Sequence, residues 1–400
     1  MIDRISILGT GLIGGSLALS WQEHRPNGTI VGHDRPDVLT AAEERGAIDE
    51  KAADPVTAVE DADLVVLATP LATILKLLDT IGGHLPEGCF VTDVGSVKQP
   101  VVDQATDVLP DHVQFLGGHP MAGAEDAGIE HADPLLFENA VYALSLPSGG
   151  DEDAFGESYA PLIDLIETTG ARPLHLAPDR HDRLVAAMSH LPQLLAVALA
   201  NTAAEADDAN GDDGTLALEL AGGGFRDMTR IAASPFSVWR DILVGNEGAI
   251  LDAMSSFRRT LRRLRNRLIE NDLDALEGAF DDARRARDAV PGDTKGFLHP
   301  LSEVYVKAPD EPGVLHDLTG HLSDAELNVK DIELQTVREG TGGTFRLAFA
   351  DRTGGRLRRV ASRVAGDRRG CDVLPSTGAF EEDSDSQRWG ATRCRLPPPR

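Results

Sequence analysis

The chain has 400 residues, of which 42% are apolar, and it carries a formal net charge of −27 at pH 7. This length and apolar content suffice for two or three domains with separate cores, and no apolar run is long and glycine-poor enough to predict a membrane span. The acidic balance argues against a nucleic-acid-binding protein, which needs a basic stripe, and requires the site of any anionic ligand to supply local positive charge.

A glycine-rich turn lies near the start of the chain. Residues 4–8 predict a short buried strand, and Gly9, Gly11 and Gly14 form the pattern G-x-G-x-x-G at the start of a predicted helix. In a dinucleotide-binding βαβ unit these glycines make the tight turn, admit the pyrophosphate and let the helix pack on the strand. The N–H groups of the first helical turn, which holds Leu12 and Ile13, would face the phosphates.

The next predicted strand ends at an acidic residue. Asp34 lies twenty residues beyond Gly14, at the end of the segment 29–34. Its carboxylate would accept hydrogen bonds from ribose hydroxyls and would repel a 2′-phosphate, so we predict NAD as the cofactor. The adjacent Arg35 leaves NADP open as an alternative.

The start of the chain also has features of a secretory signal, since it is apolar up to Trp21. Its glycines, the acidic Asp3 and the lack of an A-x-A cleavage site argue against that interpretation. The three cysteines, Cys89, Cys371 and Cys394, are widely spaced and have no metal-ligand pattern. We therefore expect a cytoplasmic protein with no metal site and no disulfide framework. The acidic, lysine-poor composition would also suit a salt-rich cytoplasm.

Strand-like and helix-like segments alternate over residues 1–178. The further predicted strands cover residues 64–70, 89–96, 113–120, 140–147 and 172–178. Such alternation predicts an α/β fold with a Rossmann-like, doubly wound and largely parallel sheet, whose ligands bind outside the carboxyl ends of the strands. Thr69, Pro70, Ser96 and His119 fall at such ends, so we expect them to face the cofactor.

Strand patterns disappear over residues 179–290, which predicts an all-helical domain. An apolar helix near its start contains Pro192, which predicts a kink. A later helix carries an apolar heptad stripe made of Ile250, Met254, Phe257, Leu261, Leu264 and Leu268. The stripe could pack within its own bundle, but few other long helices are available to cover it. We therefore predict a dimer seam.

The remainder of the chain predicts a separate domain. Residues 291–300 have the composition of a linker, and residues 301–376 follow the order strand, helix, strand, hairpin turn, strand, helix, strand. That order predicts a ferredoxin-like βαββαβ unit. Residues 377–400, which contain EEDSDS and three consecutive prolines, predict a disordered tail.

Two groups could carry chemistry beside a nicotinamide. A dehydrogenase needs a base for the substrate hydroxyl, and His119 at a strand end is the best candidate, although a turn histidine is the plainer interpretation. Ser96, at the end of the preceding strand, could hydrogen-bond this imidazole, cap a helix, or do both.

A glycine-rich helix start carries a pair of cations. Arg226 and Arg230 stand four residues apart on one predicted helical face, ahead of Trp239. The plainer interpretation is surface charge, with Asp227 paired to Arg230. A guanidinium nevertheless binds a carboxylate through two hydrogen bonds, so this pair is a candidate for holding an anionic substrate. The more basic stretch 258–267 is expected to be solvated.

These motifs together resemble the prephenate and arogenate dehydrogenase family. GTGLIGGS, TDVGSVK, GGHPMAGAE, SHLP and GGGFRDMTRIAAS stand in the family's order over residues 1–290. The unit from residue 301 resembles an ACT regulatory domain, with DEPGVL at the strand-to-helix turn. The resemblance implies a homodimer that converts prephenate to 4-hydroxyphenylpyruvate in tyrosine biosynthesis with NAD, and that senses tyrosine through the ACT domain.

The resemblance also implies roles for individual residues. His119 would deprotonate the substrate hydroxyl, Ser96 would orient His119, and Arg230 would bind the side-chain carboxylate. The substrate-binding set it implies is Arg226, Arg230, His190, Gln193, Glu125 and Trp239. Glu125 would tune access at the mouth of the site.

Two alternatives remain open. Gln193 stands where some family members have a histidine, so arogenate is an alternative substrate, although prephenate is favoured. The other alternative is a non-catalytic sensor of NAD and an amino acid. It gives no reason for a serine, a histidine and an arginine all to match the family.

Overall fold

The computed structural model describes residues 2–24, 27–123, 127–147, 155–208, 220–290, 302–308, 312–324, 327–338, 342–349 and 373–375. The chain divides into two compact units, the first made mainly of Met1–Val290 and the second mainly of Phe297–Arg400. The sheet-forming and helical parts of residues 1–290 therefore pack together as a single unit.

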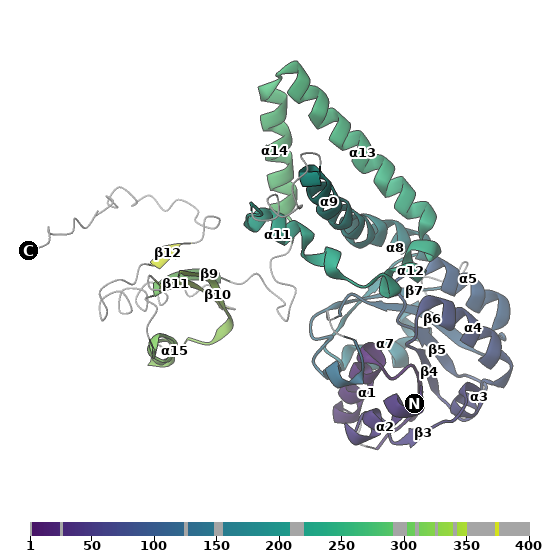
Figure 1. Ribbon diagram of the computed structural model, residues 1–400. Helices are drawn as coiled ribbons and strands as arrows, with labels where there is room; N and C mark the ends of the chain where they lie inside the picture. The colour runs from purple at the N-terminus through teal and green to yellow at the C-terminus, as the bar shows by residue number, and fades with distance from the viewer. Residues whose placement is uncertain are drawn as a thin grey trace, which may run out of the picture. The chain divides into compact units, whose positions relative to one another are not determined.

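An eight-stranded sheet forms the centre of the first unit (Figure 1). Its strands are β1 (Arg4–Leu8), β2 (Thr29–His33), β3 (Glu50–Lys51), β4 (Leu64–Leu67), β5 (Phe90–Asp93), β6 (Gln114–Pro120), β7 (Val141–Ser145) and β8 (Arg172–His175). They are arranged in the order β3-β2-β1-β4-β5-β6-β7-β8, and neighbours run parallel except for β6 and β7. The predicted Rossmann-like sheet is confirmed, with one antiparallel pairing.

Helices cover both faces of this sheet and give it two cores. Those on one face are α1 (Leu12–His24), α2 (Pro36–Glu44) and α7 (Ala160–Glu167), and those on the other are α3 (Pro55–Val59), α4 (Leu71–Ile81) and α5 (Gln99–Val108). On β4, Leu64 and Val66 join the first core, while Val65 and Leu67 join the second. A strand buried on both faces needs a continuous apolar sequence, which is what β4 has.

The helical part follows β8 directly. Its elements are α8 (Pro178–Val185), a π turn (Ala186–His190), α9 (Leu191–Asp208), α11 (Gly223–Thr229), a 3₁₀ turn (Arg230–Ala233), α12 (Phe236–Gly245), α13 (Glu247–Glu270) and α14 (Leu273–Asp288). Smaller elements of the first unit are α6 (Phe155–Ser158) and the 3₁₀ turns Gly82–His84 and Ile129–His131. The sequence predicts a kink at Pro192, and the structure has a π turn just before this residue. Proline lacks an N–H and its ring clashes with the carbonyl four residues earlier, so the helix widens there.

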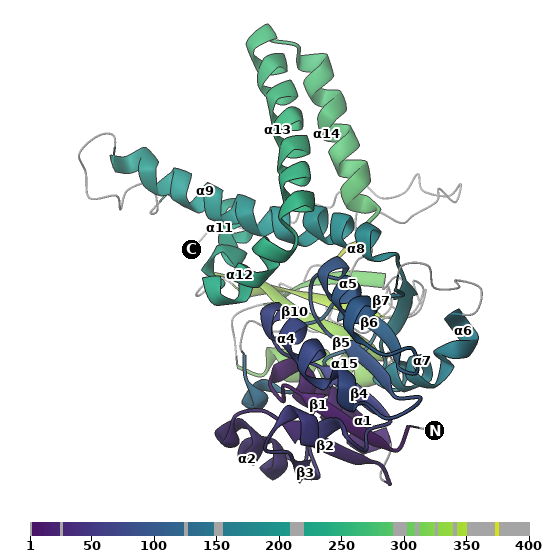
Figure 2. The ribbon, with the colours of Figure 1, turned by 90° about the vertical axis from the view of Figure 1, so that its right-hand side faces the viewer.

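The heptad stripe lies on α13, which leaves the sheet side by side with α14 as a long helical hairpin (Figure 2). Ile250 at its start is buried, but Phe257 is 37% exposed and Leu268 is 66% exposed. Most of the apolar stripe is therefore open to water in the single chain.

One helical segment, Pro178–Glu205, is long and apolar enough to cross a membrane by length and composition alone. This segment corrects the expectation that no run of the chain is long and apolar enough to do so. Core helices of soluble proteins pass the same test. The segment buries His181, Asp182, His190 and Gln193, and all four side chains are hydrogen-bonded within the protein.

The second unit contains a four-stranded sheet. Its elements are β9 (Ser302–Ala308), α15 (Val314–Asp324), β10 (Val329–Arg338), β11 (Gly342–Phe349) and β12 (Val373–Pro375). The strands are arranged in the order β10-β11-β9-β12 with antiparallel pairings. These elements agree with the predicted βαββαβ order. The predicted second helix, the linker 291–300 and the tail 377–400 lie outside the described residues.

Candidate active site

The turn between β1 and α1 uses its glycines for different reasons. Gly9 has φ of +105°, and a Cβ there would lie 2.4 Å from the carbonyl oxygen of Ala68. A Cβ on Gly14 would lie 2.0 Å from the carbonyl oxygen of Gly9. The fold itself therefore requires these two glycines. A Cβ on Gly11 would meet no atom within 4 Å, so the fold alone does not explain this glycine.

Hydrogen-bonding groups at this turn point to a bound ligand. The N–H of Gly15 donates a helical hydrogen bond to the Gly11 carbonyl. The N–H groups of Leu12 and Ile13 therefore belong to the first turn of α1, where backbone N–H groups have no partner within the helix. The Oγ1 atoms of Thr10 and Thr69 are buried without a hydrogen-bond partner. Buried hydroxyls without partners are rare in folded proteins, so these two fit a polar ligand at the carboxyl ends of β1 and β4. Pro70, which precedes α4, is exposed beside them.

Asp34, the acidic residue after β2, is held against the same turn. The Asp34 carboxylate accepts hydrogen bonds from the N–H of Thr10, at 2.8 Å, and from the N–H of Arg35, at 2.7 Å. A carboxylate oxygen can accept more than one hydrogen bond, so Asp34 remains able to bind ribose hydroxyls. The Arg35 guanidinium is exposed and lies 3.6 Å from the carboxylate of Asp37. These residues fit NAD, with its pyrophosphate at Gly11 and a ribose at Asp34.

A line of three side chains begins at the candidate base. His119 is buried in β6, and its Nδ1 lies 2.8 Å from Nε2 of His181 in α8. Nδ1 of His181 in turn lies 2.8 Å from Oδ1 of Asp182. This differs from the expectation that Ser96 orients His119. Within the described part of the chain, Nδ1 of His119 shares its hydrogen bond with His181, and Ser96 is half-buried after β5.

The loop after β5 holds the carboxylate of Asp182. Its two oxygens accept hydrogen bonds from the N–H of Lys98, at 2.7 Å, and of Gln99, at 2.9 Å. A carboxylate with these two donors and the His181 ring is fixed in one orientation.

A buried ion pair completes the connection to β6. The ammonium of Lys98 pairs with Asp93 at the end of β5, and both side chains are fully buried. The other oxygen of Asp93 accepts a hydrogen bond from the N–H of Gly118 at 3.1 Å. Because Gly118 directly precedes His119, the contacts form a closed ring through Asp93, Lys98, Asp182, His181 and His119.

Burial controls the charge state of the candidate base. It lowers the pKa of His119 well below its ordinary value, and His181, Lys98 and His190 lower it further. Burial also lowers the pKa of Lys98, while the Asp93 carboxylate acts in the opposite direction. His119 is therefore an uncharged imidazole at neutral pH, as a proton acceptor must be.

The π turn places a second histidine behind this network. The His190 ring is buried and meets Trp239 edge to face, with ring centroids 6.0 Å apart. The side-chain amide of Asn246 lies 3.3 Å from Nδ1 of His190 and donates to the backbone carbonyl of Asp182 at 2.8 Å. Burial lowers the pKa of His190 to about 4. His190, Trp239 and Asp182 thus belong to one region.

The remaining predicted substrate residues lie on the following helical segments. Gln193 is buried in α9 and donates to the Ile231 carbonyl at 3.0 Å, which ties α9 to the 3₁₀ turn that starts at Arg230. Arg226 in α11 and Arg230 are both exposed. Glu125 lies outside the described residues.

The sequence alone does not single out five residues of this network. They are Asp93, Lys98, His181, Asp182 and Asn246. Local signals exist for three of them: a histidine next to an aspartate at a helix start, and an asparagine between two predicted helices. A buried lysine has no local signature, because the sequence does not show that the fold buries it together with the Asp93 carboxylate.

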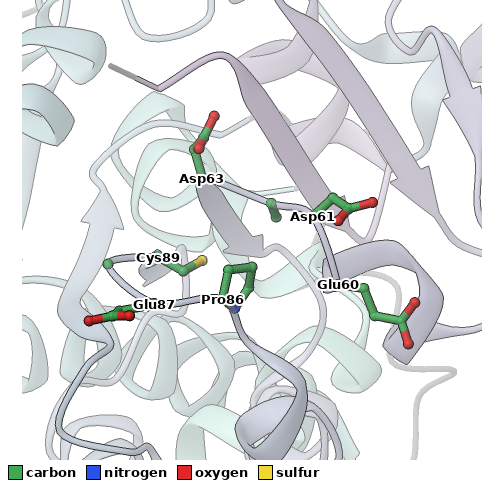
Figure 3. Close-up of a pocket in the computed structure, with 8 residues that line it drawn as sticks. Glu60, Asp61, Asp63, Pro86, Glu87 and Cys89 are labelled. Carbon is green, nitrogen blue, oxygen red and sulfur yellow. The ribbon is translucent and has the colours of Figure 1, made fainter.

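A small pocket at the amino ends of β4 and β5 contrasts with this site (Figure 3). It is lined by Glu60, Asp61, Ala62, Asp63, Pro86, Glu87, Gly88 and Cys89. Its carboxylates would repel an anionic cofactor or substrate. Burial raises the pKa of the Cys89 thiol to about 12, so this group is not a thiolate at neutral pH. The pocket is therefore a poor candidate for the active site.

The features at the carboxyl edge define a class of enzyme. A turn that binds a dinucleotide and an uncharged imidazole on the same sheet edge allow a hydroxyl to lose its proton while its carbon is oxidised. The chain is an NAD-dependent oxidoreductase.

Comparison with known proteins narrows this class to a family. Residues 17–173 match the model of the prephenate dehydrogenase nucleotide-binding domain, and residues 177–282 match that of the prephenate dehydrogenase dimerization domain. Prephenate dehydrogenase of Bacillus subtilis is 35% identical over 351 residues, which cover 87% of this chain and 92% of that protein. The chain belongs to the prephenate dehydrogenase family.

Two solved structures share this architecture. Prephenate dehydrogenase from A. aeolicus, in complex with hydroxyphenyl propionate and NAD+, has a TM-score of 0.65 and 29% identity, covering 72% of this chain and 99% of that one. Arogenate dehydrogenase from Synechocystis has a TM-score of 0.63 and 31% identity, covering 71% of this chain and 99% of that one.

We predict that Gly11→Ala weakens NAD+ binding without destabilising the fold. The new methyl group meets no protein atom but occupies the space that the pyrophosphate needs. Calorimetric titration should show Kd for NAD+ rising about tenfold or more, with Tm unchanged. Gly83→Ala, which also meets no atom, is the control that changes neither quantity. Unaltered NAD+ affinity in Gly11→Ala would contradict the assignment of the turn.

We also predict a loss of stability in mild acid from His190. Its pKa is about 4 in the folded protein but about 6.5 in the unfolded chain. The stabilisation is complete above pH 6.5 and is lost as the pH falls toward 4, by about 2 kcal/mol at pH 5. His190→Asn keeps an acceptor for Asn246 and should remove this part of the pH dependence, as measured by urea unfolding at pH 7 and pH 5. An equal fall in stability in the variant and the wild type would refute the prediction.

Proposed function

We propose that this chain is a cytoplasmic prephenate dehydrogenase that converts prephenate to 4-hydroxyphenylpyruvate with NAD+ in tyrosine biosynthesis. The observation that carries the proposal is the uncharged His119 at the sheet edge that also bears the dinucleotide turn. The B. subtilis relative, named a prephenate dehydrogenase, supports the choice of substrate. The A. aeolicus structure, which holds NAD+, supports the choice of cofactor.

We assign the proton transfer to one nitrogen of His119. Nδ1 of His119 is engaged with His181, so Nε2 is the atom available to the hydroxyl on C4 of the substrate ring. NAD+ supplies the acceptor for the hydride that leaves C4. As Nε2 takes the hydroxyl proton, the oxygen becomes a carbonyl. Loss of the ring carboxylate as CO₂ then leaves an electron pair that makes the ring aromatic, and the oxygen regains a proton as a phenol.

The substrate's charge has to be met locally, because the protein carries a net charge of −27. Arg230 would bind the side-chain carboxylate through two parallel hydrogen bonds, with Arg226 as a second cation nearby. His190, Gln193 and Trp239 would line the pocket, and Glu125 would stand at its mouth. Ser96 would contact the cofactor from the end of β5.

Arogenate is the second candidate substrate. It differs from prephenate by an amine in place of the side-chain ketone, so the two are distinguished next to the bound carboxylate. Gln193 bonds to the carbonyl that follows Arg230, which puts a neutral amide beside that turn. Similarity to the Synechocystis arogenate dehydrogenase also favours this alternative.

We also propose that the chain forms a homodimer through the open apolar stripe of α13, and that its second unit is an ACT domain that binds tyrosine. The match to a dimerization domain and the exposure of Phe257 and Leu268 support the first part. The antiparallel strand order β10-β11-β9-β12 supports the second part.

The experiment that tests the proposed reaction is an absorbance assay at 340 nm. Prephenate and arogenate are each offered with NAD+ and with NADP+. The proposal predicts the highest kcat/KM for prephenate with NAD+. A higher kcat/KM for arogenate would select the second candidate. Absence of NADH and NADPH formation from either substrate would favour the non-catalytic sensor.

The proposed roles of His119 and Arg230 predict opposite kinetic effects. His119→Asn removes the base and should lower kcat by about 10²–10⁴ with little change in KM. Arg230→Ala removes a contact made both before and during the reaction, so it should mainly raise KM. Steady-state kinetics with prephenate measure both parameters. If kcat and KM changed in the same way in His119→Asn and in Arg230→Ala, the two residues would not have the separate roles proposed here.

We predict that tyrosine inhibits the full chain and leaves a chain ending at residue 290 active but insensitive. Residues 1–290 contain the whole dinucleotide turn and the His119 network, and they form one compact unit. The same assay with added tyrosine measures both chains. If tyrosine does not affect the full chain, the regulatory proposal is wrong.

A further inference from the structure

We propose that His181 and Asp182 form a proton relay with His119, in which His181 takes the proton on Nδ1 of His119 while Nε2 of His119 accepts the proton of the substrate hydroxyl. This inference rests on the dehydrogenase function proposed above and deepens it. His181 is a positioning and relay residue, because it acts on the substrate only through His119.

The hydrogen bonds determine where each proton lies before the reaction. Asp182 accepts from the N–H groups of Lys98 and Gln99, so it faces His181 as an acceptor and requires Nδ1 of His181 to carry a hydrogen. A neutral His181 then has a bare Nε2, which accepts the N–H on Nδ1 of His119. This leaves Nε2 of His119 bare and ready to accept the hydroxyl proton.

The transfer balances without an outside proton. The hydroxyl O–H bond breaks and an Nε2–H bond forms on His119, while its Nδ1–H bond breaks and an Nε2–H bond forms on His181. Positive charge therefore ends on His181, next to the Asp182 carboxylate, instead of on His119. The hydride leaves C4 for NAD+ and the ring carboxylate leaves as CO₂. The protons then move back, so that the phenol regains one and the relay returns to its first state.

The surroundings of the two imidazoles give this transfer its advantage. His119 has cationic Lys98 and two histidines around it, and its burial makes an imidazolium there costly. His181 instead touches a carboxylate that is fixed by two backbone donors. The other ionisable groups packed around the pair are Lys98, whose charge is met by Asp93, and His190 in the π turn. Moving the positive charge from His119 to His181 thus brings it next to the Asp182 carboxylate.

A purely orienting role for His181 is the competing explanation, and pH dependence separates the two. Protonation of the relay from solvent gives His181 a second N–H, which points at Nδ1 of His119. His119 must then carry its hydrogen on Nε2, where it can no longer accept the hydroxyl proton. If His181 is a relay residue, the fall of kcat/KM at low pH therefore reports protonation of the His119–His181 pair. If His181 only orients His119, that fall reports protonation of His119 alone.

The test is the pH profile of the full-length enzyme and of His181→Gln, with prephenate and NAD+. Glutamine offers an acceptor to His119 but cannot take a proton. We expect kcat to fall by about 10²–10³ with KM changed less than about threefold. We also expect the acid limb of kcat/KM to move by about one pH unit or more to lower pH, because His119 then titrates alone. His112→Gln, which replaces a hydrogen-bonded histidine at the amino end of β6, should behave as wild type.

Each result supports or overturns the relay. A His181→Gln variant with wild-type kcat, or with reduced kcat and an unmoved acid limb, would overturn it. If the variant fails to fold, as judged by Tm, the solvent isotope effect of the wild-type enzyme decides: the relay predicts a curved dependence of kcat on the D₂O fraction, because two protons move together, and a linear dependence would mean that His119 acts alone. Failure of the proposed function looks different, since wild-type enzyme would then oxidise neither prephenate nor arogenate.

Discussion

The active site depends on the closed ring of contacts that joins Asp93, Lys98, Asp182, His181 and His119. Each of these ionisable side chains is buried, and none would be stable there without the next. The ring connects the ends of two neighbouring strands to the first helix after the sheet. It therefore determines both where the candidate base lies and that it is uncharged. A change in any member alters the position of His119 and its basicity together.

The parts of the structure that depend on local sequence could be predicted. The glycine pattern, the apolar strands and the acid after β2 each follow from residues close in the chain, and all appear where expected. The partner of His119 could not be predicted, because His181 lies 62 residues away and its distance from β6 depends on how α8 packs. We expected Ser96 in that role, since it ends the preceding strand. The lysine in TDVGSVK likewise looks like a surface residue, because nothing in that motif shows that the fold buries both it and Asp93.

The charge of the protein sets the second constraint. A chain with a net charge of −27 repels an anion at long range, so the anionic substrate that we propose has to be attracted by a few cations at short range. Arg226 and Arg230 are suited to this because they lie after a glycine-rich helix start and are exposed. The acid-lined pocket of Figure 3 illustrates the opposite environment on the other edge of the sheet. The same sheet thus separates a site for anions from a surface that rejects them.

The central claim is that His119 is an uncharged imidazole whose Nε2 is bare and whose Nδ1 carries the hydrogen. The most direct measurement is the nitrogen NMR spectrum of the wild-type enzyme with ¹⁵N-labelled histidine at neutral pH, with the His119 signals assigned by their loss in His119→Asn. The account predicts a protonated Nδ1 and an unprotonated Nε2 for His119. Signals of an imidazolium, or of the tautomer with hydrogen on Nε2, would contradict it.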